Sequence, residues 1–576
     1  MSPRLRVYLL RYRRAYAAGF LLSIAAALLL MVNPVLVRLA IDGVARGTAL
    51  RLLGLYALGL ALVHAGVLVL RYFWRMSIFG ASRRIEYEMR NEYFAHLQRM
   101  HLAFFHRTRT GDLMARAVND LSTVQRFLGP GLMHGFSTVI TFAIAVGFML
   151  TVDLRLTLVM MFILPLVSLT FIILAPRIHA RFELVQDQFS TISAKAQENF
   201  SGIRVVKAFA QEPYEIEAFA ALNREYIRRN LGVIKTSGAL WPLIDFFLGL
   251  AAVVLLWQGG SAVIAGRITI GQFVQFTAYL GLLAWPMVAL GWVVNLMQRG
   301  LASMKRLDEI FTQRPAIVDH PDARPMPALR GEIEFQDLTF AYNGAPVLRG
   351  ITLRIPAGHT VAIVGPTGSG KSTLVSLIPR LFDVTEGRLL IDGVDVRRIR
   401  LEDLRRQIGF VPQDTFLFSD TLRENIGYGV EAAADGVVQR AAEVSALVRD
   451  LSDLPRGYET VVGERGVTLS GGQKQRTAIA RALACDPRIL ILDDALSSVD
   501  THTEEEILTR LRAVMATRTA ILISHRISTV RAADLIVVLD DGRIVERGTH
   551  DELLARGGLY AELYQKQLLE EELERT

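Results

Sequence analysis

Six long apolar segments in the first 300 residues constrain the fold of this chain more than any other feature. A bilayer core about 30 Å thick needs roughly 20 mainly apolar residues per helix. Lipid cannot satisfy backbone polar groups, so such segments cross a membrane only as helices or closed barrels. The segments cover about residues 16–40, 52–74, 130–152, 155–176, 239–265 and 270–297. The sequence therefore predicts a membrane domain of six long transmembrane helices.

Basic residues identify the cytoplasmic side of this membrane domain. The net charge is +8 at pH 7, and one cluster of arginines precedes the first apolar segment while another follows the second. These residues are Arg4, Arg6, Arg11, Arg13 and Arg14, and then Arg83, Arg84, Arg90, Arg99, Arg107, Arg109 and Arg116. Cytoplasmic flanks of membrane helices are enriched in this way. We expect a multi-pass protein of the cell inner (plasma) membrane, with a cytoplasmic N-terminus and no nucleic-acid partner.

Two long connections lie on the predicted cytoplasmic side. Residues 75–129 and 177–238 are polar, with apolar positions at helical spacing, so we expect the membrane helices to extend into the cytosol. The turn-like stretches Phe105–Asp112 and Ala210–Pro213 are candidate segments for contacting a following domain, although solvated hairpins would look similar. Prolines in 313–330 predict a linker between a membrane domain of 1–312 and a second domain of 331–576.

A glycine-rich loop opens the chemistry of the second domain. A buried strand is predicted over His359–Val364, and the loop after it leads into a helix near Lys371. Backbone N–H groups of such a loop surround phosphates, a lysine reaches the β- and γ-phosphates, and a serine ligates Mg²⁺. The predicted ATP-binding residues are Gly365, Pro366, Thr367, Gly368, Ser369, Gly370, Lys371, Ser372 and Thr373, with Ser372 on Mg²⁺.

A second buried strand, Ile489–Leu492, ends in two aspartates. The carboxylate of Asp493, at the strand end, suits a Mg²⁺–nucleotide site. Asp494 follows it directly and bears on hydrolysis, as the family resemblance below implies.

Further motifs accompany these two in a fixed order. They are Tyr342 after a predicted strand, Gln413 within Phe410–Asp414, Ser470–Gln473 after Leu469, Asp500 at the end of Ser497–Asp500, and His525 after the strand Ala520–Ser524. In this order they resemble the ABC ATPase family, and the six spans with two long cytoplasmic connections resemble its exporter type. The implied fold is a membrane α-helical domain followed by an α/β P-loop ABC ATPase domain with a helical subdomain.

The resemblance implies roles for these residues. Tyr342 would stack on adenine, Gln413 would touch Mg²⁺ and the attacking water, and His525 would lie beside the γ-phosphate. The signature residues Ser470, Gly471, Gly472 and Gln473 would cap the nucleotide of an opposite subunit, and Asp500 belongs to the loop that crosses the dimer interface. Gly463–Gly466 resembles the exporter loop that senses the coupling segments.

Asp494 departs from the family pattern, in which a glutamate at this position orients the attacking water. The aspartate is one methylene shorter, and a misplacement of roughly 1 Å can cost on the order of 10²-fold in rate. We predict ATP binding with slow turnover here, unless backbone shifts compensate and Asp494 acts as the base. The chain combines this aspartate with an intact signature. That combination resembles the asymmetric heterodimeric exporters, whose second half-transporter carries the glutamate.

The predicted function is ATP-driven export of amphipathic drugs, peptides or lipids by one half of such a heterodimer. A homodimeric lipid or drug exporter and an ATP-gated regulator or channel remain alternatives. Charged or polar residues inside the spans should face a water-filled cavity or a partner; these include Arg38, His64, Arg71 and Asp245. With Asp245, the residues Gln272, Gln275, Trp292, Asn295 and Gln298 line a substrate path or make helix–helix hydrogen bonds.

Overall fold

The computed structural model describes residues 2–463 and 469–575, and the chain forms two compact units. The helical unit comprises Met1–Gln98 and Arg109–Arg314. The α/β unit comprises Arg99–Thr108 and Pro315–Thr576. The short stretch Arg99–Thr108 thus folds with the α/β unit, although helical-unit residues flank it on both sides in the chain.

The prediction of six membrane-length helices is confirmed. Within the described residues, six helices are long and apolar enough to cross a membrane: Arg13–Ala45, Leu50–Gln98, Thr110–Val152, Leu154–Ser201, Glu212–Ile264 and Ile270–Phe311. Each is longer than a bilayer requires, since even the shortest, with 33 residues, spans about 50 Å at 1.5 Å per residue. The excess length extends the helices beyond the membrane.

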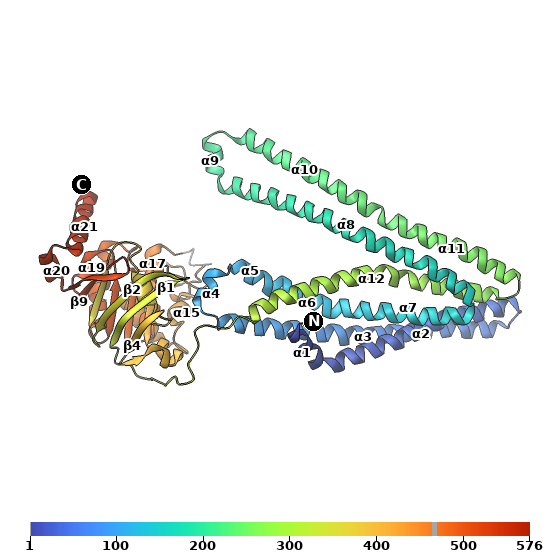
Figure 1. The fold of residues 1–576 in the computed structure, drawn as a ribbon, viewed down its shortest axis with the longest axis horizontal. Helices are drawn as coiled ribbons and strands as arrows, with labels where there is room; N and C mark the ends of the chain where they lie inside the picture. Colours follow the sequence, from blue (N-terminus) through green and yellow to red (C-terminus); the bar gives the residue numbers. More distant parts are fainter. Residues whose placement is uncertain (1, 464–468, 576) are drawn as a thin grey trace. The chain divides into compact units, whose positions relative to one another are not determined.

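The elements of this unit follow in chain order (Figure 1). They are α1 (Pro3–Arg11), α2 (Arg13–Ala45), α3 (Leu50–Gln98), α5 (Thr110–Ala115), η1 (Arg116–Asp120), α6 (Leu121–Arg126), η2 (Phe127–Gly131), α7 (Leu132–Val152), α8 (Leu154–Ser201), α9 (Ile203–Ala208), α10 (Glu212–Gly238), α11 (Leu240–Ile264) and α12 (Ile270–Phe311). The segments η1 and η2 are π-helical turns within an otherwise continuous helix from Thr110 to Val152.

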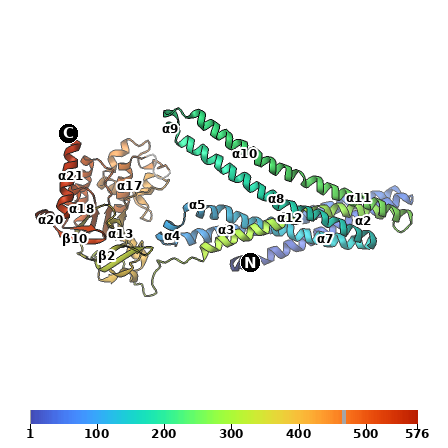
Figure 2. The same ribbon diagram turned by 45° about the horizontal axis from the view of Figure 1, so that its top comes forward.

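The second long connection forms an antiparallel helical hairpin. Helices α8 and α10 lie side by side in Figures 1 and 2, and the Lys195 ammonium pairs with the Glu215 carboxylate at 2.6 Å. The predicted turn at Ala210–Pro213 follows a short helix, α9, that the sequence did not indicate. The backbone reverses just after α9, where Ala210 has φ +50°.

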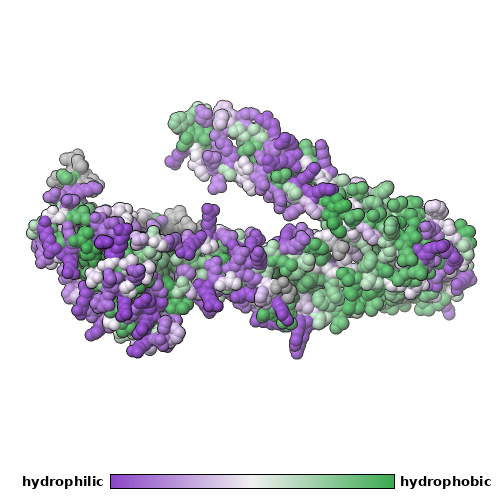
Figure 3. Space-filling view, viewed as in Figure 1, coloured by the Kyte–Doolittle hydropathy of each residue, from purple (hydrophilic) through white to green (hydrophobic). Residues whose placement is uncertain are grey.

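Hydropathy changes along this unit in the way a membrane protein requires. In Figure 3 hydrophobic side chains prevail over the region of α7 and α11, and hydrophilic ones along α10 toward α9. The helices therefore carry their apolar surface where lipid would surround them and their polar surface where water would.

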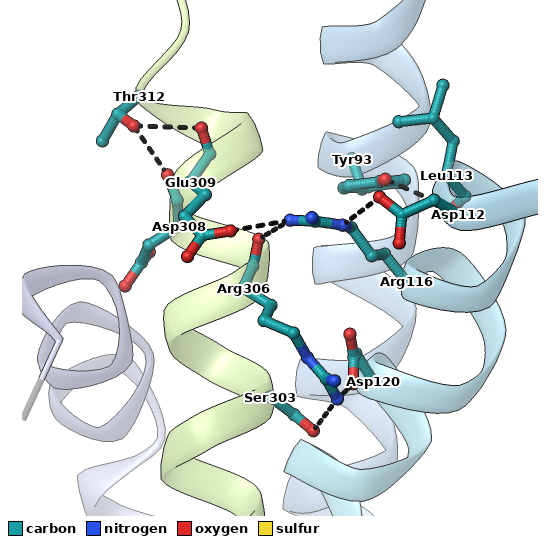
Figure 4. Close-up of polar contacts among 10 residues, drawn as sticks. All are labelled: Tyr93, Asp112, Leu113, Arg116, Asp120, Ser303, Arg306, Asp308, Glu309 and Thr312. Carbon is teal, nitrogen blue, oxygen red and sulfur yellow. Dashed lines mark hydrogen bonds and ion pairs between the residues drawn. The ribbon is translucent and has the colours of Figure 1, made fainter. Parts of the chain in front are cut away.

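Ion pairs join the end of α12 to the helix that begins at Thr110 (Figure 4). The Arg116 guanidinium lies between two carboxylates, bonding Asp112 at 2.9 Å and Glu309 at 3.1 Å. Arg306 on α12 reaches back to the buried Asp120 and to the Ser303 hydroxyl at 3.3 Å. Because several charges share one network, its geometry is more firmly held than that of an isolated surface pair.

The first candidate contact segment lies on the α/β unit. Helix α4 (Leu102–Arg107) packs Leu102 and Ala103 against the core of that unit. The ring centroids of His106 and Phe382 are 5.9 Å apart, and Arg107 donates a hydrogen bond to Asn343. This part of the predicted segment Phe105–Asp112 therefore contacts the second domain.

Two sheets form the framework of the α/β unit. The six-stranded sheet has the order β10 (Arg543–Gly548), β9 (Leu535–Asp540), β3 (Thr360–Val364), β8 (Thr519–Ile523), β7 (Ile489–Asp493) and β6 (Ile408–Val411), with all neighbours parallel except β10 and β9. The antiparallel sheet has the order β2 (Ala345–Ile355), β1 (Ile333–Tyr342), β4 (Glu386–Ile391) and β5 (Val394–Asp395). The carboxyl ends of the parallel strands meet at one edge, where open α/β sheets bind their ligands.

Helices cover these sheets and form a separate helical subdomain. The covering elements are α13 (Lys371–Ser376), η3 (Val396–Arg398), α14 (Leu401–Arg406), α18 (Thr501–Met515), α19 (Ile527–Val530), α20 (His550–Arg556) and α21 (Leu559–Arg575). The subdomain holds α15 (Leu422–Gly427), α16 (Asp435–Val444), η4 (Leu447–Ser452), η5 (Gly457–Glu459) and α17 (Gly471–Ala484), which share a core. The predicted fold class, membrane helices followed by an α/β domain with a helical subdomain, is confirmed.

Close packing of α12 on η2 yields a stability prediction. A Cβ at Gly300 would lie 2.4 Å from the Cβ of Phe127, an atom that cannot rotate away. We expect Gly300→Ala to lower the apparent unfolding temperature in detergent, because overpacking costs about 1–3 kcal/mol and exceeds the roughly 0.5–1 kcal/mol that alanine contributes to a helix. Gly249→Ala on α11, with no atom within 4 Å, is the matched control. Equal unfolding temperatures for the two variants would contradict this packing.

Candidate nucleotide site

The glycine-rich loop leaves β3 in a conformation that only glycine allows at its first position. Gly365 has φ +147°, and a Cβ there would lie 2.0 Å from the carbonyl oxygen of Leu539. Gly370 has φ +99° and precedes α13, so the loop turns tightly and its helix starts at Lys371. The predicted order of strand, loop and helix is therefore what the chain forms.

Lys371, Ser372 and Asp493 converge where this loop meets the end of β7. The Ser372 hydroxyl donates to the Asp493 carboxylate at 3.0 Å. The Lys371 ammonium donates to the carbonyl oxygens of Gly365 at 2.9 Å and Pro366 at 2.8 Å. Burial lowers the pKa of Lys371, an effect that the carboxylates of Asp493 and Asp494 oppose. Burial also raises the pKa of Asp493, against the hydrogen bond from Ser372.

Asp494 lies beside this group in a strained backbone conformation. Its φ is +49°, which is uncommon outside glycine, and its N–H donates to the carbonyl of Ile523 on β8 at 2.9 Å. Its own carbonyl accepts from the Ser497 hydroxyl at 3.0 Å. The backbone of Asp494 is thus held on both sides, by β8 and by the loop that follows Asp494.

One pocket of about 190 Å³ collects most of the predicted residues. Its lining includes Gln413 after β6 and His525 after β8, which the sequence places far from the loop. The complete lining is Val347, Thr367, Gly368, Gly370, Lys371, Ser372, Thr373, Gln413, Asp493, Asp494, Ile523 and His525. The ends of four strands thus bring their side chains to this pocket. Two of the lining residues, Val347 and Ile523, belong to no motif and were not predicted.

The donor chemistry of this pocket fits a magnesium nucleotide. The Lys371 ammonium hydrogen-bonds only loop carbonyls, and the buried Ser369 hydroxyl has no hydrogen-bond partner among the described residues. Both are donors to which phosphate oxygens are suited. The Ser372 hydroxyl and the Asp493 carboxylate present the oxygen ligands that Mg²⁺ prefers.

The signature residues form the start of α17 and do not line this pocket. Ser470 caps the helix, its hydroxyl accepting from the Gln473 N–H at 3.2 Å while the Gln473 amide oxygen accepts from the Ser470 N–H at 3.0 Å. Gly471 and Gly472 occupy the first turn, whose N–H groups favour an anion. Among the described residues that line this pocket, none belongs to the signature.

Gln475, which carried no motif, fixes the loop after Asp494. Its side-chain N–H donates to the Ser497 hydroxyl at 2.9 Å, and its amide oxygen accepts from the Ser498 N–H at 2.9 Å. Asp500 ends this loop by capping α18, accepting from the Thr503 N–H at 3.0 Å. Gln475 therefore links the signature helix to the Ser497–Asp500 loop, a contact that carries no signal in the sequence.

Two further predicted features lie elsewhere. Tyr342 ends β1 and packs edge-on against Phe340 and Phe382, with ring centroids 4.8 and 5.3 Å away; it does not line the pocket. Of the predicted sensing loop Gly463–Gly466, residues 464–466 lie outside the described residues.

Within the membrane helices, two of the candidate path residues make local bonds instead. Gln272 completes a capping box with Thr269, and the buried Gln275 hydrogen-bonds Tyr279 at 3.3 Å. Both interactions lie within α12 and its N-cap rather than between helices, and the Gln275 amide oxygen is buried with no hydrogen-bond partner among the described residues.

A phosphate-loop site on an α/β unit, carried by a chain with six membrane-length helices, defines a membrane-bound P-loop ATPase. Residues 16–287 match the ABC transporter transmembrane region, and residues 348–497 match the ABC transporter ATPase model. The chain therefore belongs to the ABC transporter family, with the six-helix membrane domain and single ATPase domain of an exporter half-transporter.

Known relatives cover the whole chain. It is 37% identical to the multidrug resistance-like ATP-binding protein MdlA of Escherichia coli, covering 100% of this chain and 98% of that one. It is 38% identical over 502 residues to an ATP-dependent lipid A-core flippase of Syntrophus aciditrophicus, covering 87% and 84%. A solved bacterial Atm1-family ABC exporter with ATP bound matches with a TM-score of 0.79 at 31% identity, covering 97% and 99%.

Lys371 gives a direct test of this site. We expect Lys371→Ala to abolish photo-crosslinking of azido-ATP to this chain, because the charge-assisted bonds that a lysine makes to phosphate are roughly twice as strong as neutral ones. The labelled chain would be resolved by gel electrophoresis after irradiation. Lys566→Ala, an exposed lysine on α21, is the control and should label normally. Undiminished labelling of Lys371→Ala would contradict the assignment.

Proposed function

We propose that this chain is one half of an ATP-driven exporter of amphipathic compounds, and that its own ATP site turns over slowly. The first part is supported by the exporter architecture and by relatives whose names refer to multidrug resistance and to lipid flipping. The second part rests on one observation: the residue that follows the metal-site aspartate on β7, and that shares its pocket, is Asp494.

The side chains of the pocket divide the work of binding. Lys371 and the backbone of Gly365–Gly370 hold the phosphates of ATP, while Tyr342 flanks the adenine from the end of β1. Ser372, Asp493 and Gln413 hold Mg²⁺, which when bound neutralises the charge that develops on the phosphates. Each of these residues is of the type that binding requires, so affinity for ATP should be normal.

Hydrolysis needs a group that orients the attacking water, and we propose that Asp494 performs this role poorly. Asp494 and His525 line the pocket together with the phosphate loop. An aspartate reaches about one carbon–carbon bond less far than a glutamate, and phosphoryl transfer depends mainly on positioning. The backbone of Asp494 is held by β8 and by Ser497, which limits any shift that would restore the reach.

The signature residues supply the reason to propose a different partner chain. Ser470, Gly471, Gly472 and Gln473 are intact and do not line this chain's pocket, so they can complete a site on a second subunit. Asp500 and the loop before it would lie at that interface. A partner half-transporter with glutamate at the Asp494 position would then hydrolyse ATP while this chain retains its own.

A homodimeric exporter is the second candidate, and the family match and the relatives' names fit it equally well. In that case both sites would contain Asp494 and the whole transporter would turn over slowly. An ATP-gated regulator or channel is less well supported, because the signature, Gln413 and His525 are all present.

Substitution of Asp494 separates these possibilities. In a heterodimer we expect Asp494→Asn to retain most of the ATPase activity of the complex purified from native membranes, because the partner's site performs most of the hydrolysis. Asp494→Glu should restore a second active site and raise the activity. The measurement is the steady-state release of phosphate from ATP by the reconstituted complex.

Asp453→Asn, an exposed aspartate of the helical subdomain, is the control for expression and assembly. A loss of activity on the order of 10²-fold in Asp494→Asn would show that Asp494 carries the reaction and would contradict the slow-site proposal. A single polypeptide size in the native complex together with that loss would support the homodimer.

A further inference from the structure

A second pocket lies within the helical unit and has a chemistry of its own. Its volume is about 370 Å³, within the range of small-molecule sites. It is built from α2, α3, α7 and α12, at positions within or beside the predicted membrane spans. Its lining includes Arg71, Arg75, Trp74, Trp285 and His134.

Two arginines give this pocket a positive wall. Arg71 and Arg75 are four residues apart on α3, so they project from the same face of the helix. Neither has a carboxylate within ion-pair distance among the residues that the structure describes, and none of the described lining residues is acidic. His134 of α7 lines the same pocket. Unpaired charge at membrane depth is costly, so it indicates a water-filled cavity or a ligand of opposite charge.

The rest of the wall is apolar and aromatic. Trp74 and Trp285 come from different helices, and alanines, leucines, Met133 and Pro286 complete the surface. The Trp74 indole N–H is buried and has no hydrogen-bond partner among the described residues, which leaves one more donor at the wall. A cavity with cationic groups on one side and aromatic surface on the other is complementary to an anion with an apolar body.

We propose that this pocket binds the anionic head and part of the apolar body of the exported compound. The head is a carboxylate or a phosphate, held by Arg71 and Arg75, and the body contacts Trp74 and Trp285. This inference rests on the proposed export function and narrows its substrate class to amphipathic anions. Arginines near the end of a membrane helix can also extend toward lipid head groups without binding a substrate, and the test separates that case.

The test uses the assembled transporter in phosphatidylcholine nanodiscs, where no anionic lipid competes. ATPase stimulation is measured with dodecyl phosphate and pyrenebutyrate, with neutral pyrenebutanol, and with cationic dodecyltrimethylammonium. We expect the anions to stimulate at the lowest concentrations. Arg71→Gln combined with Arg75→Gln should raise their half-maximal concentration about tenfold or more, as loss of a charge-assisted hydrogen bond implies. The half-maximal concentration of pyrenebutanol should stay within about twofold, since it lacks the charge that the arginines bind.

Arg84→Gln is the matched control, an exposed arginine of the same helix that does not line the pocket. Its half-maximal concentrations should equal those of the unaltered protein, and an equal shift in Arg84→Gln would overturn the inference. Unfolding temperatures of both variants check that each is folded. Stimulation by phosphatidylglycerol that depends on Arg71 and Arg75 would identify the anion as a membrane lipid, whereas stimulation by the added amphiphiles alone would identify a free compound.

The inference and the export proposal fail in different ways. Neutral or cationic amphiphiles that stimulate ATP hydrolysis and accumulate in vesicles, while anions do neither, would overturn the anion site and leave the exporter standing. No stimulation and no ATP-dependent accumulation for any amphiphile would overturn the exporter proposal itself.

Discussion

The carboxyl ends of four parallel strands, β3, β8, β7 and β6, meet at one edge of the six-stranded sheet, and the nucleotide site depends on that meeting. The strands themselves are buried and mainly apolar, and their polar site residues either end the strand, as Asp493 ends β7, or follow it. The hydrogen bond from Ser372 to Asp493 links the loop after β3 to the end of β7 at 3.0 Å. The backbone of Asp494 is held both by this framework, through the carbonyl of Ile523 on β8, and by its own loop, through the Ser497 hydroxyl.

The connection between the two units likewise depends on a segment that packs away from its neighbours in the chain. Helix α4 folds onto the α/β core through Leu102 and Ala103, yet the chain enters it from the end of α3 and leaves it into α5. The chain therefore crosses between the two units at residues 98–99, 108–109 and 314–315. The ion pairs of Arg116 and Arg306 tie the helix after α4 to the end of α12, which itself leads into the α/β unit.

The six helices and the phosphate site could be predicted from the sequence, because two strong physical signals specify them. Apolar runs of membrane length specify the six helices, and a glycine loop between a buried strand and a helix specifies the phosphate site. Contacts between residues distant in the chain carry no such signal. The bonds from Gln475 to Ser497 and Ser498 depend on how α17 approaches β7. The pocket around Arg71 needed four helices to be brought together, although the cost of charge in a membrane had already marked Arg71 itself.

The central claim is that ATP on this chain stays uncleaved while the complex works. Its most direct measurement is the chemical state of nucleotide crosslinked to this chain during turnover, using azido-ATP labelled at the α-phosphate. The account predicts that the label on this chain is mainly triphosphate, while diphosphate accumulates on the partner subunit. Diphosphate appearing on this chain at the rate of overall turnover would contradict it.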